Sequence, residues 1–375
     1  MQEQPLIFYA SIGHGHKHAA FALYKEFMKR GFRPKMIDTF YELSPTLHYS
    51  LLKSYLTLLK LSPSLWRKAY VLSEKYPLFH MTDRLCSLFI RRLYEMVEKE
   101  RPPFVISTNA FVTPLLAAVK MKKRSEMALY SVITDFNMHP AYVRNGVNLY
   151  FTQDPNCHEF AEKYRLPKEL FIATGIPIAT SSFLSYSKKK LRYELNLPQK
   201  EKVVLLAGGG FGLANYVMII KQLEKMQEKL VILCMTGQNK KAFMHLSLMK
   251  SKHELRVISF THKFLQYLRA SDVVISKAGG LTMAESLICE TPILIFQPVP
   301  GHEEHNAQFL EKNGAAICIK DKNDLLFHTT QVLFNHDVQR QMKESARRLQ
   351  KPYAAKHIVD RILQCEHQHG HAFPC

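Results

Sequence analysis

The sequence predicts an α/β fold of two Rossmann-like domains in tandem, and three observations lead to this prediction. The chain has 375 residues, which is long for a single hydrophobic core. Short apolar runs alternate with helix-length segments in both halves, as in βαβ units that build a parallel sheet. Glycine-rich turns follow several of these runs, where a strand would pass into a helix.

The expected elements follow the apolar runs. In the first half the expected strands are 5–10, 33–40, 103–109, 128–136, 149–154 and 170–178, with a helix from about His16 to Arg30. Residues 180–202 are rich in Ser and Lys and predict a linker. In the second half the expected strands are 202–210, 229–237, 254–260, 272–276, 291–296 and 315–320, followed by a helical stretch over about 336–365. The expected domains are 1–180 and 200–350, and 351–375 form a C-terminal helix and tail that returns to the first domain.

Residues 41–98 interrupt the alternation, because they contain no strand-like run. Apolar residues recur there at helical spacing, namely Leu51, Leu52, Tyr55, Leu58 and Leu59. Trp66 stands beside Arg67 and Lys68. One interpretation is a helical insertion packed on its own domain, since an apolar stripe is usually core. The other is an amphipathic face in a membrane interface, where tryptophan and basic side chains are stable together.

Composition limits the function classes. The formal net charge is +19, which favours an anionic partner, either nucleic acid or acidic lipid. No compact basic stripe or aromatic-basic module occurs, so nucleic acid is not expected. Seven cysteines without a Cys-x-x-Cys pattern predict reduced thiols in the cytoplasm. No signal peptide or apolar run of about 18 residues is visible, which predicts a soluble or peripheral protein.

The first glycine motif is "YASIGHGHKHAA" at 9–20. Gly13 and Gly15 permit a tight turn that leaves backbone N–H groups free. His18 stands where a dinucleotide fingerprint has its third glycine, which disfavours an NAD or FAD site. His16 is either a general base with a near-neutral pKa or a residue that only caps the turn.

Two further motifs predict an anion site in the second domain. Gly208, Gly209 and Gly210 follow an apolar strand, and their amides could approach a phosphate closely. Residues 276–285, "SKAGGLTMAE", end one strand and begin a helix, whose N-terminus favours a diphosphate. Thr282 and Glu285 fit either a capping box or a carboxylate that accepts both hydroxyls of a ribose.

Polar side chains follow two other strands. In "PVPGHEEHNAQ" at 298–308, His302, Glu303 and Asn306 could hydrogen-bond the hydroxyls of a sugar, because ligands of open α/β sheets lie at the carboxyl ends of strands. In "VITDFNMHP" at 132–140, Asp135 could orient a histidine or act as the base itself, and the alternative is an Asp that caps the turn. No Asp-x-Asp occurs, so no metal or other cofactor is expected.

Together these motifs resemble glycosyltransferase family 28, and within it the diacylglycerol glucosyltransferases and monogalactosyldiacylglycerol synthases. The resemblance rests on "TDF..H" (134–139), "GIPI" (175–178), "GGGFG" (208–212), "SKAGGLTMAE" (276–285) and "PVPGHEEHNA" (298–307). It implies a GT-B fold with both parallel sheets facing an interdomain cleft. It also implies a UDP-glucose or UDP-galactose donor, a diacylglycerol acceptor, inversion without metal, and an anionic membrane bound on its cytoplasmic face by the helical insertion.

The resemblance assigns roles to matched positions of this chain. His16 is the expected catalytic residue near the acceptor hydroxyl, with Asp135 as its partner. The expected acceptor or membrane residues are Trp66, Arg67, Lys68 and His139. The expected donor-binding residues are Gly15, Gly208, Gly209, Gly210, Phe260, Gly279, Gly280, Leu281, Thr282, Glu285, His302, Glu303 and Asn306. The family usually has Gln at position 302 and often Trp at position 142, where this chain has His302 and Tyr142.

Two other functions are compatible with the sequence, and a third is disfavoured by it. One is a related transferase acting on a polyprenyl-linked or soluble acceptor. Another is a non-catalytic protein that binds a nucleotide sugar at a membrane. A UDP-sugar epimerase would share the tandem architecture, but the basic, tryptophan-bearing insertion has no role in it.

Overall fold

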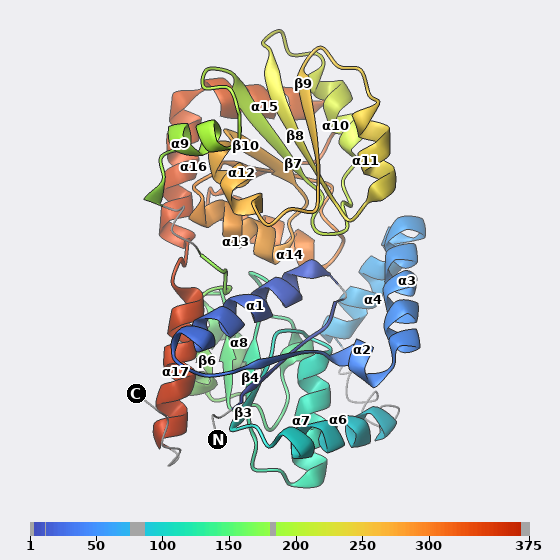
Figure 1. Ribbon diagram of the computed structural model, residues 1–375, viewed down its shortest axis with the longest axis vertical. Helices are drawn as coiled ribbons and strands as arrows, with labels where there is room; N and C mark the ends of the chain where they lie inside the picture. The colour runs from blue at the N-terminus through green and yellow to red at the C-terminus, as the bar shows by residue number, and fades with distance from the viewer. Residues whose placement is uncertain (1–3, 12, 76–86, 181–184, 369–375) are drawn as a thin grey trace. The chain divides into compact units, whose positions relative to one another are not determined.

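The structure is a computed structural model that describes residues 4–11, 13–75, 87–180 and 185–368. The chain forms two compact units. Unit 1 comprises 1–179, 300–302 and 353–375, and unit 2 comprises 180–299 and 303–352. Figure 1 shows that each unit is a sheet with helices packed against it. These are the two Rossmann-like halves of an α/β fold.

Unit 1 is built on a six-stranded parallel sheet with the strand order β2-β1-β3-β4-β5-β6. The strands are β1 (Leu6–Tyr9), β2 (Lys35–Asp38), β3 (Phe104–Ser107), β4 (Ala128–Val132), β5 (Leu149–Phe151) and β6 (Phe171–Ile172). The helices are α1 (His14–Lys29), α2 (Thr39–Leu43), α3 (Pro45–Leu61), α4 (Pro63–Lys75), α6 (Ser87–Glu100), α7 (Val112–Lys123), α8 (Cys157–Lys163) and α17 (Ala354–Gln368), with short 3₁₀ turns η1 (Pro140–Tyr142) and η2 (Lys168–Leu170).

Unit 2 has the sheet order β12-β11-β10-β7-β8-β9, also parallel throughout. Its strands are β7 (Lys202–Ala207), β8 (Leu230–Gly237), β9 (Glu254–Ser259), β10 (Val273–Ser276), β11 (Ile293–Phe296) and β12 (Ala316–Ile319). Its helices are α9 (Lys188–Glu194), α10 (Tyr216–Leu223), α11 (Lys240–Ser247), α12 (Phe264–Ala270), α13 (Gly280–Ile288), α14 (His302–Lys312), α15 (Asp324–Phe334) and α16 (His336–Leu349). Strand order reverses between β7 and β10, and this is where open α/β sheets bind ligands.

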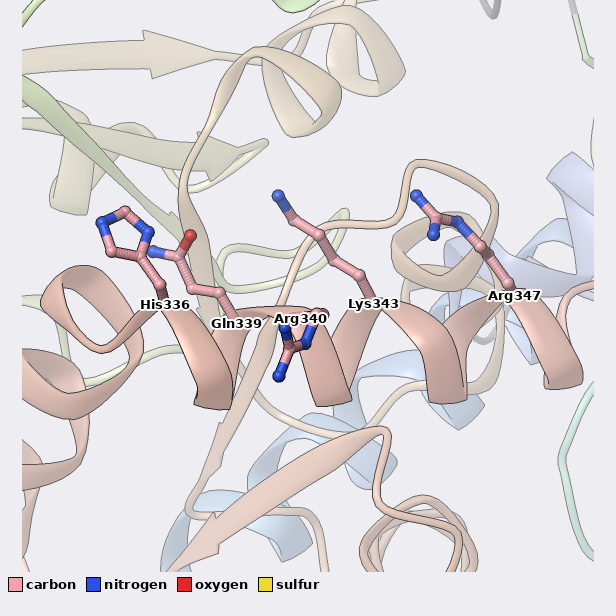
Figure 2. Close-up of a pocket in the computed structure, with 5 residues that line it drawn as sticks. All are labelled: His336, Gln339, Arg340, Lys343 and Arg347. Atoms are coloured by element: carbon pink, nitrogen blue, oxygen red, sulfur yellow. The ribbon is translucent and has the colours of Figure 1, made fainter.

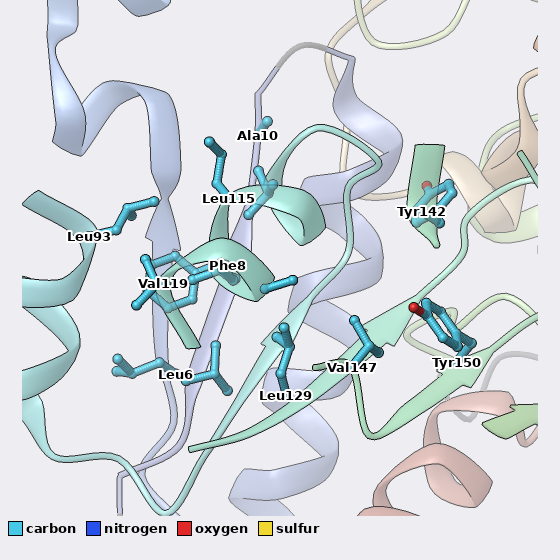
Figure 3. Close-up of a cluster of buried hydrophobic side chains, with 14 of the residues drawn as sticks. Leu6, Phe8, Ala10, Leu93, Leu115, Val119, Leu129, Tyr142, Val147 and Tyr150 are labelled. Atoms are coloured by element: carbon cyan, nitrogen blue, oxygen red, sulfur yellow. The ribbon is translucent and has the colours of Figure 1, made fainter. Parts of the chain in front are cut away.

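All twelve expected strands are present, and most are apolar runs buried in a parallel sheet, whereas β2 and β9, each at one end of its sheet's strand order, are more exposed. In β1, Leu6 and Phe8 pack into one core cluster with α6 and α7, shown in Figure 3, while Ile7 and Tyr9 pack into a second cluster. That second cluster includes Ile358 of α17, so the last helix covers the other face of the sheet beside α1 (Figure 1).

Two details differ from the sequence prediction. The helical stretch expected over 336–365 is two helices, because α16 ends at Leu349 and α17 begins at Ala354 after Pro352, which cannot continue a helix. The expected linker contains α9, although 181–184 lie outside the described residues. The insertion at 41–98 is helical at its described positions except Ser44 and Ser62, which flank α3, and 76–86 lie outside the described residues.

A buried arginine fixes α9 to the sheet of unit 2. Arg192 is 6% exposed and donates to the carbonyl oxygens of Pro198, Gln199, Glu201 and Ala270 at 3.0–3.3 Å. Its guanidinium also pairs with Asp272 at 2.7 Å. Through these five acceptors, the Arg192 side chain ties the segment that precedes β7 to the segment that precedes β10.

We expect Arg192→Ala to destabilise unit 2 by about 3–5 kcal/mol, because it leaves the half-buried Asp272 carboxylate without one of its partners and four carbonyls without their donor. Arg192→Lys keeps the positive charge but not the several N–H donors of the planar guanidinium. We therefore expect its loss of unfolding free energy to be intermediate. Scanning calorimetry would measure both. Arg340→Ala is the control, because Arg340 is 67% exposed and pairs with Asp337 on the same helix. Equal melting temperatures for R192A and R340A would contradict this role.

Candidate active site

The turn before α1 brings His16 next to the ends of β3 and β4. Gly13 caps α1 with φ of 94°, a conformation that favours glycine, and His16 lies in the first turn. Its Nδ1 is 2.8 Å from the carbonyl oxygen of Thr108 and 3.0 Å from the hydroxyl of Thr134. Because a carbonyl oxygen only accepts, Nδ1 carries the proton and donates it to Thr108. Nε2 is then the ring nitrogen with a free lone pair, as a general base requires.

The electrostatic surroundings suit the same role. Burial lowers the pKa of His16 below its ordinary value, and the charge of Asp135 acts in the opposite direction. The imidazole is therefore neutral at pH 7 and able to accept a proton. Asp135 is half-buried and follows β4, so the structure brings the two expected catalytic residues to the same edge of the sheet.

His139 lies between the helical insertion and the turn after β4. Its ring is buried, and its Nδ1 accepts from the amide of Ala141 at 3.0 Å. Its Nε2 is 3.3 Å from the Ser73 hydroxyl, and its ring lies 4.7 Å from that of Tyr70. His139 therefore joins α4 of the insertion to the turn after β4. Tyr142, where the family often has tryptophan, is also buried in this turn, and burial raises the pKa of its hydroxyl.

In unit 2 the glycine loop after β7 is tightly packed. A Cβ on Gly208 would lie 2.7 Å from the backbone carbon of Gly212 and 2.8 Å from the amide nitrogen of Leu213. Gly209 has φ of 69°. Close packing therefore requires glycine at position 208 of the "GGGFG" run, whether or not the loop binds phosphate. The sequence alone does not distinguish these two reasons for glycine. Gly209 and Gly210 are half-exposed, so their backbone is accessible to a ligand.

The loop after β10 lies beside the glycine loop. The Ser276 hydroxyl donates to the carbonyl of Ala207 at 2.8 Å, which ties the end of β10 to the end of β7. Helix α13 begins at Gly280 with Gly279 as its cap. Gly279, Gly280, Leu281 and Thr282 thus form the turn that opens α13, and its orphan N–H groups stand at the switch point of the sheet.

Glu285 is not part of a capping box. The helix begins before Thr282, so Thr282 cannot cap it, and Glu285 lies inside the helix. Its side chain is 8% exposed, and burial raises its pKa to about 8. In the part of the chain that the structure describes, its carboxylate has no hydrogen-bond partner. A buried carboxyl of this kind is costly, and ligand hydroxyls would offset that cost.

The loop after β11 brings two buried polar residues to the same edge. Glu303 is 2% exposed; its Oε1 is 2.5 Å from Lys277 Nζ and its Oε2 accepts from the amide of Val299 at 2.9 Å. Asn306 is fully buried and donates to the carbonyl of Ala278 at 3.0 Å. Lys277 was not singled out from the sequence, although it stands inside "SKAGGLTMAE". The pattern that could have identified Lys277 is a single basic residue between the end of a strand and the start of a helix.

The remaining expected residues are more exposed. Phe260 follows β9 and is 41% exposed, with its ring 5.4 Å from that of His262. His302 is half-buried and belongs to unit 1, where its ring lies 6.2 Å from that of Tyr70. The Trp66 indole donates to the carbonyl of Pro300 at 3.0 Å within unit 1, while Arg67 and Lys68 are exposed.

The surface of α3 and α4 carries apolar side chains that the sequence analysis did not name. The most exposed are Tyr49, Leu61, Leu65 and Leu72, between 48% and 75% exposed. They lie at the ends and outer faces of these helices, whereas Leu51 packs on the core of unit 1. Their exposure could not be read from helical spacing, because the same spacing describes a buried stripe.

Other features give no second site. Among the described residues, no group of three His, Cys, Asp or Glu side chains could hold a metal ion, and no helix is long and apolar enough to cross a membrane. A depression of about 250 Å³ is lined by His336, Gln339, Arg340, Lys343 and Arg347 of α16 (Figure 2). Arg340 pairs with Asp337 and Arg347 with Glu290, so carboxylates already offset much of its charge.

Comparison with known proteins gives matches over both halves of the chain. The family model for monogalactosyldiacylglycerol (MGDG) synthase matches residues 16–178, and the model for the glycosyltransferase family 28 C-terminal domain matches 203–360. A processive diacylglycerol beta-glucosyltransferase of Bacillus cereus (strain B4264) is 29% identical over 98% of this chain and 95% of its own length. The protein of the same name from Bacillus thuringiensis (strain Al Hakam) is 28% identical with the same coverage.

Solved structures share the fold. MurG of Acinetobacter baumannii aligns with a TM-score of 0.63 at 18% identity, covering 96% of this chain and 99% of MurG. The glycosyltransferase SnogD from Streptomyces nogalater aligns with a TM-score of 0.60 at 11% identity, covering 97% of this chain and 100% of SnogD. At these identities the likeness shows the fold alone, and that fold is GT-B.

The raised pKa of Glu285 predicts a pH dependence of stability. The folded state holds this proton up to about pH 8, whereas a glutamate in the unfolded chain loses it near pH 4.5. Stability should therefore fall by a few kcal/mol as pH rises from about 4.5 to 8. Glu285→Gln removes this loss, so we expect its melting temperature to exceed that of the parent protein at pH 8 and to approach it near pH 5.

Scanning fluorimetry across pH 5–8.5 would measure the difference. Glu228→Gln is the matched control, since Glu228 is an exposed glutamate of the same unit. A melting difference between E285Q and the parent that stays constant with pH would show that Glu285 titrates normally.

Proposed function

We propose that this chain, which belongs to glycosyltransferase family 28, transfers a hexose from a UDP-sugar to diacylglycerol or a glycosyl-diacylglycerol with inversion. The observation that carries the proposal is that each unit holds polar groups at the carboxyl edge of its own sheet. Unit 1 holds a neutral histidine with a free Nε2, and unit 2 holds glycine loops and a buried carboxyl at the switch point of its sheet.

The donor half-site suits a nucleoside diphosphate sugar. The amides of Gly209 and Gly210 and the start of α13 supply uncharged donors for a diphosphate. Glu285 would accept the hydroxyls of the ribose, and Phe260 offers an exposed ring for the base. Glu303 and Asn306 would hydrogen-bond the sugar, because each of their side-chain oxygens has two lone pairs and can accept more than one hydrogen bond. No metal is needed in this scheme.

The acceptor half-site suits an alcohol. His16 Nε2 would take the proton of the acceptor hydroxyl as its oxygen attacks the anomeric carbon, and Thr108 holds the ring in the tautomer that permits this. Asp135 would stabilise the imidazolium that forms. Attack from one face breaks the bond to the diphosphate on the other face, so the configuration inverts.

The acceptor's chemistry favours work at a membrane. Exposed Tyr49, Leu61, Leu65 and Leu72 on α3 and α4 stand near the basic Arg67 and Lys68 in the sequence, a combination that suits a lipid interface. The net charge of +19 would draw the protein to anionic lipid. We therefore propose peripheral binding to the cytoplasmic face of the cell membrane. The curated relatives named above carry diacylglycerol in their names, which favours this acceptor over a polyprenyl-linked one.

The test is a panel of radiolabelled UDP-glucose, UDP-galactose and UDP-N-acetylglucosamine with diacylglycerol vesicles, with and without anionic lipid, in EDTA. Labelled glycolipid from a UDP-hexose, increased by anionic lipid, is the expected product. Label transferred only to a polyprenyl-linked acceptor would favour the alternative transferase. Binding of UDP without transfer to any acceptor would indicate a non-catalytic protein.

The role of His16 gives a sharper prediction. His16→Ala should lower kcat by about 10²–10⁴, the usual contribution of a general base. Because burial lowers the pKa of His16, the rate of the parent protein should fall with acid only below its ordinary value of 6.5, where the ring becomes protonated. Initial rates from pH 5 to 9 would show both effects. His158→Ala, at an exposed histidine of unit 1, is the control. Near-normal turnover in H16A would exclude His16 as the base.

A further inference from the structure

One ion pair in unit 2 is unexplained by the roles assigned so far. Lys277 Nζ is 2.5 Å from Glu303 Oε1, and the two side chains are 19% and 2% exposed. The other oxygen of Glu303 accepts from the amide of Val299, so the carboxylate is held on both sides. The ammonium is therefore held in position while remaining partly open to solvent.

The pair lies between the two loops that form the donor half-site. A Cβ on Gly209 would be 3.4 Å from Lys277 Cε and 4.0 Å from Nζ, so the lysine side chain passes over the glycine loop after β7. A Cβ on Gly279 would be 3.5 Å from Glu303 Oε1, so the carboxylate borders the start of α13. Because Gly209 and Gly279 have no side chains, a ligand bound at their backbone amides could also reach the Lys277 ammonium.

The neighbouring hydrogen bonds make this position rigid. Ser276, just before Lys277, is tied to the end of β7, and Ala278, just after it, accepts from the buried Asn306. The backbone of Lys277 is thus fixed at the carboxyl end of β10 by bonds to β7 and to α14. A cation held in this way costs little reorganisation when an anion binds.

The charge balance of the proposed reaction requires such a group. When the bond between the anomeric carbon and the diphosphate breaks, its electron pair goes to the phosphate oxygen, and the distal phosphate gains a negative charge. A helix N-terminus supplies about half a charge, which is small against that change. A lysine ammonium supplies a full charge, and lysine commonly binds phosphate as a point charge.

We propose that Lys277 binds the distal phosphate of the nucleoside diphosphate and stabilises it as the leaving group, with Glu303 as the positioning residue that holds the ammonium. This inference rests on the proposed function. Lys277 stays protonated throughout. The acceptor oxygen forms the new bond to the anomeric carbon, its proton goes to His16, and the electron pair of the broken bond stays on the diphosphate.

The test compares UDP with UMP, because only UDP has a distal phosphate. Calorimetry in EDTA would measure both affinities for the parent protein, Lys277→Met and Lys277→Arg. We expect K277M to bind UDP about 10- to 100-fold more weakly and UMP nearly unchanged, and K277R to retain most of the preference for UDP. In the transfer assay K277M should lose kcat by about 10²–10³. Lys221→Met, at an exposed lysine of the same unit, controls for the loss of one charge.

The outcomes separate this inference from the proposed function. A parent protein that binds neither UDP nor UMP would overturn the proposed function itself. A parent protein that binds UDP, with a UDP-to-UMP ratio unchanged in K277M, would overturn the role of Lys277 alone. Should K277M fail to fold because Glu303 is left buried and unpaired, K277M/E303Q removes both charges and gives the same comparison, since neither UDP nor UMP carries the sugar.

Discussion

Parallel pairing of every strand is the constraint on which both half-sites depend. Because the strands of a parallel sheet all point the same way, the loops that follow them gather at one edge. In unit 2 the order reverses between β7 and β10, and the Ser276 hydroxyl closes that edge by its bond to Ala207. The glycine loop, the start of α13 and the loop after β11 thereby come together, although 65 or more residues separate the first from the others in the chain. The same geometry in unit 1 brings the first turn of α1 to the ends of β3 and β4.

The two half-sites use burial in opposite ways. Burial keeps His16 neutral and free to take a proton, because the charged imidazolium is disfavoured away from water. Burial also keeps the Glu285 carboxyl protonated near neutral pH, where its fold would otherwise have to hold an unpaired charge. Lys277 and Glu303 instead pair with each other. Each unit thus sets the protonation of its key group by how far water is excluded.

Much of the fold and part of the site could be predicted from the sequence. The strands were found because buried parallel strands are continuous apolar runs, and the glycine loops because they follow those runs. The break at Pro352 was missed, since helical periodicity resumes on both sides of it. Whether Glu285 caps α13 or is buried within it depends on where the helix begins. The spacing Thr-x-x-Glu fits a helix start at either Gly280 or Thr282, so the sequence alone does not decide between these positions. The carbonyl of Thr108 that orients His16 is a backbone atom 92 positions away, which no side-chain pattern reveals. Exposure on α3 and α4 likewise requires knowing what each helix packs against.

The position of α17 has a consequence for how the protein is made. This helix, the last described element of the chain, completes the core of unit 1 through Ile358, Val359 and Ile362, and Arg30 of α1 pairs with Asp360 at 2.5 Å. A nascent chain leaves the ribosome from its N-terminus, so the sheet of unit 1 and helix α1 are made before α17, which packs beside α1 on the same apolar face. The strands of unit 2 also precede α17 in the chain, so both sheets are made before the helix that completes unit 1. The core of unit 1 is therefore complete only after α17 has been synthesised.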